Sequence, residues 1–310
     1  MAHSGAETVL RIGAGVTGFN WLPILLAERL GFLARRGLKL EIHRLGAVDK
    51  TTAAVKAGDI DIAVTPPEGA IADRAAGGAL RIVAGNANRL PLSLIAQPRY
   101  RRIEELKGAR LGTSSLTEGT ALYTMEVLRR HGLNHPEDYS FSVAGMHPAR
   151  WEALKAGSID AAVQLIPLNF VAEDAGYANL GEVSDYIPEI VFAAFIVHDG
   201  WAQAHRAALT GFLEAMLEGA AGLQDPANDE ALVSIVGEVA QTSGPYAQRS
   251  LDYMRRMQVF PPDLSIPEGA FAASLELMRR AGLADEATLE AAPTVLDDSY
   301  RLQALRTLRG

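Results

Sequence analysis

Two stretches, Ala54-Val-Lys-Ala-Gly-Asp-Ile-Asp-Ile-Ala-Val64 and Ala153-Leu-Lys-Ala-Gly-Ser-Ile-Asp-Ala-Ala-Val163, are identical at most positions and lie 99 residues apart. Each reads as the end of a helix, a glycine that stops the helix, and a buried strand of small apolar residues. The lysine complements the helix dipole, and the glycine supplies a left-handed cap. The recurrence predicts two similar strand–helix–strand units, although helix–strand junctions of this kind also recur by chance.

The sequence around both copies alternates between short apolar runs and helical patterns. Strands are expected at 9–12, 38–43, 60–64, 80–84, 109–112, 139–143 and 159–163. Helices are expected at 23–35, 49–57, 68–76, 117–131 and 148–156. Strands that alternate with short helices are typical of α/β folds with mainly parallel sheets. Beyond residue 201 helical patterns dominate, with expected helices at 201–223, 229–241, 246–258 and 268–281.

Composition excludes several classes of protein. The chain has 310 residues, enough for about two domains, and 48% of them are hydrophobic, which argues against disorder. The net charge is −8 and no basic stripe is visible, so no nucleic-acid partner is expected. Cysteine is absent, which rules out disulfides, cysteine nucleophiles and thiolate metal sites. The start of the sequence lacks the pattern of a signal peptide. Two interpretations fit: a cytoplasmic protein, or an extracytoplasmic one, periplasmic or membrane-associated, whose export signal has been removed.

Four segments resemble a known family: 26–42, 56–63, 103–112 and 208–221. In order and spacing they are similar to type II periplasmic binding proteins. More narrowly, they are similar to the solute-binding proteins of ABC transporters for sulfonates, taurine, nitrate and thiamine pyrimidine precursors. The resemblance spans roughly residues 9–260.

The resemblance implies two α/β lobes joined by two crossover strands, with a ligand cleft between the lobes. Segments 92–97 and 191–197 fit the crossovers. Lobe 1 would be 1–92 with 196–310, including the C-terminal helices, and lobe 2 would be 93–195. In such folds the ligand lies at the carboxyl ends of strands and the N-termini of helices, and it biases a hinge toward the closed state.

The loops at these strand ends supply the expected ligand-binding residues. Each loop follows a strand of one lobe and faces the cleft if the fold is correct. The expected residues are Phe19, Asn20, Trp21, Thr65, Pro66, Ser114, Ser115, Thr117, Glu118, Gly119, Gln164 and Asn169. Trp21 is expected to form a ligand wall, or alternatively to pack under the first helix as core. The Ser114–Thr117 turn is expected to form a polar clamp opposite it, because hydroxyls and free N–H groups at a helix start bind anions; simple helix capping is the alternative.

The chemistry of the ligand stays open at this point. A sulfonate or carboxylate usually requires a cation, and the nearest candidates in sequence are Arg89 and Arg150. Glu68 and Glu118 would suit a ligand with amine groups instead. Phe19-Asn-Trp-Leu-Pro23 is similar to the aromatic opening of the pyrimidine-precursor binders, but the histidine that often follows there is missing.

Other site chemistries fit the sequence less well. Gly13-Ala-Gly-Val-Thr-Gly18 matches a dinucleotide fingerprint, yet Pro23 indicates that the helix begins only near residue 22, so the third glycine would lie outside it. No metal site or cofactor is expected, because Gly132 and Pro136 break the helix that would align His131 with His135. His147 is expected in a turn near the cleft.

The sequence thus predicts a non-catalytic solute-binding protein. It would capture a small organic ligand (a sulfonate, a carboxylate or a pyrimidine-like molecule) by hinge closure and deliver it to an ABC transporter permease if exported. A monomer is expected. The alternative is a cytoplasmic enzyme or ligand sensor on the same fold.

Overall fold

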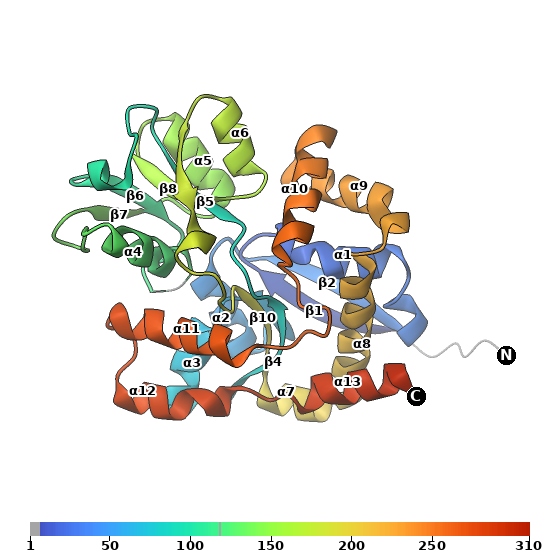
Figure 1. The fold of residues 1–310 in the computed structure, drawn as a ribbon. Coiled ribbons are helices and arrows are strands. Elements are labelled where there is room, and N and C mark those ends of the chain that lie inside the picture. The colour runs from blue at the N-terminus through green and yellow to red at the C-terminus, as the bar shows by residue number, and fades with distance from the viewer. Residues whose placement is uncertain (1–6, 118) are drawn as a thin grey trace.

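The computed structural model describes residues 7–117 and 119–310, which build two α/β lobes around separate five-stranded sheets (Figure 1). The first sheet has the strand order β2 (Leu38–Arg44), β1 (Thr8–Ala14), β3 (Ile62–Thr65), β10 (Ala193–His198) and β4 (Leu80–Ala87). The second has the order β7 (Ser140–Val143), β6 (Arg110–Thr113), β8 (Ala161–Leu165), β5 (Leu92–Ala96) and β9 (Ala178–Glu182). In both sheets the first three strands are parallel and the fourth runs antiparallel to the third.

The repeated sequence occupies the same place in each lobe. In lobe 1, α2 (Val48–Ala57) ends at Gly58, whose φ is +81°, and the chain enters β3. In lobe 2, α5 (His147–Lys155) ends just before Gly157, whose φ is +68°, and the chain enters β8. A left-handed backbone favours glycine at both positions. Both strands are buried at the centre of their sheets, which confirms the predicted α/β architecture.

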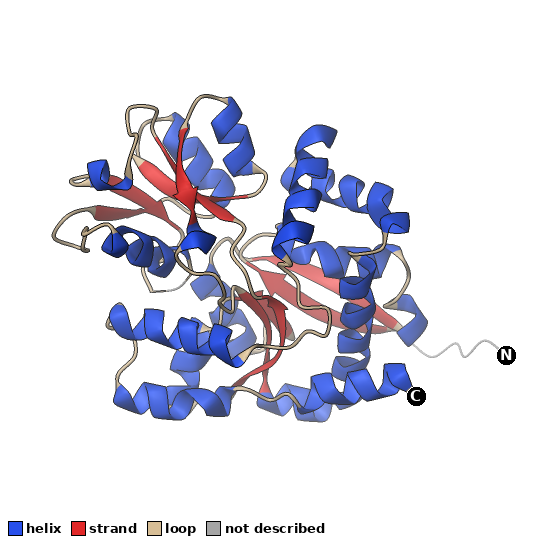
Figure 2. Ribbon diagram, viewed as in Figure 1, coloured by secondary structure: helices blue, strands red, loops and turns tan. Residues whose placement is uncertain are grey.

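Helices cover the faces of both sheets (Figure 2). Lobe 1 also contains η1 (Phe19–Trp21), α1 (Leu22–Arg29), η2 (Ala34–Arg36), α3 (Glu68–Ala75), α7 (Asp199–Ala204) and α8 (Arg206–Gly222). Lobe 2 contains η3 (Ile103–Leu106), α4 (Thr120–Arg130), α6 (Leu168–Asp174) and η4 (Val183–Asp185). The C-terminal part returns to lobe 1 as η5 (Pro226–Asn228), α9 (Asp229–Ala240), α10 (Gly244–Met257), α11 (Glu268–Arg280), α12 (Glu286–Ala291), η6 (Ala292–Val295) and α13 (Ser299–Arg309).

The chain passes between the sheets twice, slightly before the expected positions. The segments predicted as crossovers, 92–97 and 191–197, are largely occupied by β5 and β10, and each of these strands pairs within one sheet only. The passages themselves are 88–91 and 186–192. They lie side by side, since Ile190 N donates to Asn88 O at 3.0 Å.

Three predicted helices begin or end at least three residues away from their predicted bounds or are divided in the structure. The first helix ends at Arg29 because Gly31, with φ of +72°, turns the chain. The helix expected from residue 117 begins at Thr120. The helix expected over 201–223 is two helices, α7 and α8, separated at His205. Among the residues that the structure describes, no helix is long and apolar enough to cross a membrane.

Candidate functional site

A cleft lies between the lobes at the carboxyl ends of the parallel strands. It consists of a wide cavity of about 740 Å³ and a small one of about 60 Å³. Both cavities are lined by Val16, Gly18 and Phe19 from lobe 1 and by His147 and Leu165 from lobe 2. Because they share these five residues, we treat the small cavity as the inner end of the cleft and the wide one as its mouth.

Five of the predicted ligand-binding residues line the inner end, and Phe19 is one of them. Asn20 and Pro66 approach from lobe 1, while Ser114 and Gly119 approach from lobe 2. Gly119 has φ of +61°, which favours glycine, and a Cβ atom there would lie 3.8 Å from the Pro66 ring. The loops after β3 and β6 therefore face each other across the lobes, as the sequence predicts.

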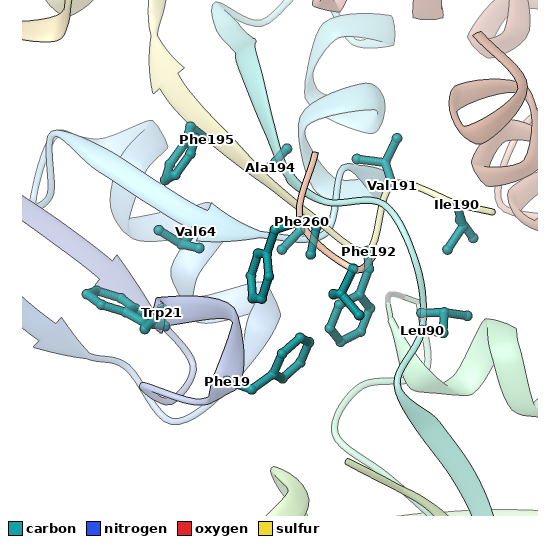
Figure 3. Close-up of a cluster of buried hydrophobic side chains, with 14 of the residues drawn as sticks. Phe19, Trp21, Val64, Leu90, Ile190, Val191, Phe192, Ala194, Phe195 and Phe260 are labelled. Atoms are coloured by element: carbon teal, nitrogen blue, oxygen red, sulfur yellow. The ribbon is translucent and has the colours of Figure 1, made fainter. Parts of the chain in front are cut away.

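The two aromatic residues of η1 point in different directions (Figure 3). Phe19 lines both cavities and stacks on Phe192, with ring centroids 5.7 Å apart. Trp21 is fully buried in the core of lobe 1, near Val64, and lines neither cavity. The expectation that Trp21 forms the ligand wall is therefore corrected: Phe19 has that position, because η1 rotates residues two apart away from each other.

The rest of the predicted polar clamp does not reach the cavities. Ser115 Oγ accepts a hydrogen bond from Thr117 N at 3.2 Å, so these two residues form a local turn before α4. They do not cap the helix either, since Gly119 precedes it and no side chain of the described residues caps its start. Thr65 is buried beside the cleft and lines neither cavity. Glu118 lies outside the described residues.

Gln164 and Asn169 also have other positions than expected. Both are fully buried and line neither cavity. The Gln164 amide, in the orientation that satisfies both of its ends, bonds His147 O and Trp151 N in the first turns of α5. Asn169 Nδ2 donates to Ser93 Oγ at 2.8 Å. These amides stabilise lobe 2 internally, which corrects the prediction that they contact ligand.

A buried cation lies behind the inner end of the cleft. Arg150 is fully buried; its Nη1 donates to Thr120 Oγ1 and its Nη2 to His147 Nδ1, both at 2.5 Å. Leu165 N also donates to His147 Nδ1, at 3.2 Å, so this nitrogen carries no proton and the ring is neutral. Burial, with the charge of Arg150 as a second cause, holds the pKa of His147 well below its usual value. Burial also lowers the pKa of Arg150 to about 9, which leaves it charged at neutral pH.

Thr120 and His147 lie between the guanidinium of Arg150 and the cleft. Each is the first residue of a helix, α4 and α5 respectively, and each lines the inner cavity. The positive ends of two helix dipoles therefore converge there above a buried guanidinium. The sequence analysis named Arg150 as a candidate cation but did not find Thr120. The helix start at residue 120, rather than 117, would have been the signal.

The mouth of the cleft is mostly apolar. Lobe 2 contributes Trp151 and Val171, while α9 and α10 contribute Val236, Val239 and Tyr246. Arg44 lines the mouth as well, and its Nε donates to Thr17 Oγ1 at 3.0 Å. Sequence reasoning missed the α9–α10 wall, because nothing local connects these helices with loops more than 200 residues earlier. Arg89 lines neither cavity.

The histidine pair considered for metal binding has other contacts. His131 lies 2.7 Å from both Glu104 Oε1 and Tyr186 OH, and His135 packs against Tyr139. Across residues 7–117 and 119–310, no three histidine or acidic side chains converge as metal ligands. The glycines of the apparent dinucleotide motif precede η1, and α1 begins only at Leu22, so Gly18 lies outside the helix.

Comparison with known proteins places this cleft in a family. The sequence profile of the NMT1/THI5-like family matches residues 18–228. The chain belongs to that family. No curated protein sequence matches the chain.

Solved structures share the fold over nearly the whole of this NMT1/THI5-like chain. A protein from Bordetella bronchiseptica RB50 is 18% identical, with a TM-score of 0.80 over 98% of this chain and 99% of its own. The alkanesulfonate-binding protein SsuA from Xanthomonas axonopodis pv. citri, bound to MOPS, is 18% identical, with a TM-score of 0.75 over 96% and 99%. The periplasmic nitrate-binding protein NrtA from Synechocystis PCC 6803 is 14% identical, with a TM-score of 0.78 over 97% and 89%. These likenesses confirm the periplasmic-binding-protein fold.

Proposed function

We propose that this protein is a solute-binding component of an ABC import system. It captures a small organic molecule between its lobes and presents the closed form to a membrane permease. The observation that carries the proposal is the cleft itself. Residues of both lobes line its inner end, and residues of both lobes line its mouth. The titles of the SsuA and NrtA structures, which name binding proteins for alkanesulfonate and nitrate, support the same role.

Closure follows from the way the lobes are connected. The passages 88–91 and 186–192 lie side by side, so they form a narrow joint about which the lobes can rotate. We place the boundaries between lobe 1 and lobe 2 at these two passages, and not at 92/93 and 195/196 as predicted, because β5 pairs from Leu92 in the second sheet and β10 pairs from Ala193 in the first. A ligand that contacts both lobes favours the closed state by the free energy of those contacts. The protein works outside the cytoplasmic membrane as a monomer and performs no covalent step.

Native mass spectrometry combined with small-angle scattering tests this proposal. Protein purified under gentle conditions is expected to carry a bound small molecule that dissociates unchanged on denaturation. Protein stripped of that molecule is expected to have a larger radius of gyration than the loaded form. Phe19→Ala should weaken rebinding by roughly 5- to 150-fold, the range for truncating a buried aromatic anchor.

Two results would contradict the proposal. Conversion of the bound molecule to a product, or a covalent adduct, would favour the enzyme alternative. Equal radii for the loaded and stripped protein would argue against closure. Trp21→Ala is the matched control, because this core residue lines neither cavity; it should lower the melting temperature while the folded fraction retains its affinity.

A further inference from the structure

Two arginines are buried in the described parts of the chain, and they differ in their partners. Arg301 bonds the carboxylate of Asp298 through Nε and Nη2, at 2.5 and 2.7 Å. Arg150 has no carboxylate within 4.0 Å among residues 7–117 and 119–310, and its Nε has no hydrogen-bond partner there. A buried charge without a counter-charge is costly. Its retention beside a ligand cleft calls for an anion that arrives with the ligand.

The two side chains that accept hydrogen bonds from Arg150 among the described residues, Thr120 and His147, are both neutral. Thr120 Oγ1 accepts from the guanidinium and lies 3.2 Å from Thr113 Oγ1. His147 accepts from it through Nδ1 and has no charge. Neither acceptor therefore neutralises the positive charge of Arg150. The inner cavity, of about 60 Å³, is small beside the mouth and has room for one compact head group.

The mouth requires a different chemistry from the inner end. Its lining includes one cationic and one anionic side chain, Arg44 and Glu152, and the Glu152 carboxylate lies 2.8 Å from Lys155 Nζ. The rest is dominated by aliphatic and aromatic groups such as Leu22, Leu168 and Val239. With about 740 Å³ of space, the mouth accommodates an apolar body much larger than the head group.

We propose that the ligand is an organic anion with an apolar body, and that Arg150 determines the preference for its charge. The head group occupies the inner cavity against Thr120 and His147, and the apolar body fills the mouth beside Phe19. Arg150 lines neither cavity, so it is a positioning residue that acts through Thr120 and His147. This inference rests on the proposed solute-binding function and narrows its ligand class.

A matched set of probes tests the charge and the apolar body separately. The probes are 1-octanesulfonate, 1-octanol, octylamine and ethanesulfonate, titrated calorimetrically into stripped full-length protein at pH 7. We expect 1-octanesulfonate to bind at least tenfold more tightly than each of the other three. Octanol and octylamine share its chain but lack the negative charge, whereas ethanesulfonate keeps the charge and lacks most of the apolar body.

Substitutions at Arg150 show whether this residue sets the preference. Arg150→Met should weaken 1-octanesulfonate binding by roughly tenfold, because it removes the positive charge behind Thr120 and His147, and change octanol binding by less than about twofold. Arg150→Lys keeps the charge and should retain much of the preference. Because Arg150→Met also removes an uncompensated buried charge, the ligand-free variant should melt no lower than the parent protein. If neither variant folds, Thr120→Val is expected to reduce the same preference at an intact guanidinium.

Each result decides between the inference and the broader function. Tighter binding of octylamine or octanol than of 1-octanesulfonate would overturn the inference, while compaction with the preferred probe in scattering would leave the solute-binding function standing. An unchanged sulfonate preference in Arg150→Met would overturn the role of Arg150. Failure of all four probes to bind, together with no co-purified molecule, would overturn both the inference and the proposed function.

Discussion

The lobes touch along two seams with different chemistry, one between α10 and α6–β9 and one between α11 and α4. In the α10 seam, aromatic hydroxyls meet acidic groups: Tyr246 OH donates to Asp174 and Tyr253 OH to Glu182, both at 2.7 Å. Phe170 of α6 packs edge-on against the ring of Tyr253, with centroids 5.8 Å apart. This seam combines directional hydrogen bonds with packed rings.

The α11 seam is ionic and centres on one carboxylate. Arg280 of α11 donates to Glu126 of α4, with Nη1 2.8 and 2.9 Å from the two carboxylate oxygens. Arg129 and Arg130 of α4 donate to the same carboxylate, at 2.8 to 3.0 Å. The Glu126 side chain is only 3% exposed, whereas the three arginines are 36 to 51% exposed.

The contrast indicates how each seam responds when the lobes move. Arginines that reach water can change partners at low cost, so the α11 seam can open and reform. The α10 seam continues into lobe 2, because Glu182 also accepts from Ser93, which in turn accepts from the buried Asn169. Opening it breaks two hydrogen bonds from phenols to carboxylates and separates packed rings, which costs more per contact than opening an exposed ion pair. We therefore expect the α10 seam to hold while the α11 seam adjusts.

The largest expected effect follows from removing the charge of Glu126. Burial alone would raise the pKa of this carboxyl, but hydrogen bonds from Arg129, Arg130 and Arg280 outweigh burial and lower it from 4.5 to about 2. Because the folded-state pKa is depressed, the stabilisation is complete above about pH 4.5 and is lost as the pH falls toward 2. After allowance for the solvated arginines, Glu126→Gln should cost about 2 kcal/mol in free energy of unfolding at pH 7.

Urea denaturation at pH 7 and at pH 2 measures this effect. The difference in unfolding free energy between the parent and Glu126→Gln should narrow sharply at pH 2, where the parent carboxylate begins to be protonated as well. Glu276→Gln is the matched control: Glu276 also binds Arg280, but its side chain is 38% exposed and lies on the same helix, so the change should be much smaller. A difference that stays constant with pH would show that the pair contributes through packing and not through charge.

A smaller effect is expected at the inner end of the α10 seam. Asn169→Ala removes the donor to Ser93 Oγ and the side-chain acceptor of Phe170 N, at 2.8 and 2.9 Å. Both partners are neutral, so the free energy of unfolding should fall by about 1.5 kcal/mol, the upper end for a hydrogen bond between neutral groups. Asn179→Ala, at an exposed position of the same lobe, should cost less. Unchanged stability with loss of ligand binding would restore Asn169 to the ligand site that the sequence predicts.

The smallest effect is expected at the exposed edge of the α10 seam. Arg249 lies over the ring of Phe170, 3.8 Å from its centroid, and Nη2 donates to Glu173 at 3.1 Å. The side chain is 46% exposed, so Arg249→Gln should cost less than about 1 kcal/mol, and less still at 1 M NaCl. A loss as large as that of Glu126→Gln would show that the two seams do not differ as we describe.

Much of the fold could be predicted because its signals are local. The glycines at 58 and 157 end their helices in a left-handed conformation, and the strands that follow are marked by small apolar residues. The alternation of strands with helices gave the parallel sheets, and the repeat gave the two lobes. The lengths of the helices were harder to predict. The apolar pattern continues beyond Arg29, but α1 ends there because Gly31 turns the chain.

The candidate site was predictable only in outline. Strand ends predicted a place at the cleft for Phe19, Asn20, Pro66, Ser114 and Gly119, which line its inner end, because a parallel sheet presents all of these loops at one edge. The direction of individual side chains was not predictable. Trp21 and Gln164 lie beside the same loops, and each points into its own lobe.

The sequence by itself determined the architecture, because helix caps and alternating apolar residues act through neighbours along the chain. The tertiary structure alone decided the chemistry of the cleft. Arg150 lies 30 residues from Thr120, and α9 and α10 lie farther still from the loops whose cavity they line. Whether a buried arginine meets a carboxylate, as Arg301 does, or two neutral acceptors, as Arg150 does, depends on which segments packing brings together. Local sequence patterns do not contain that information, because the free energy of a buried charge is set by its neighbours in space.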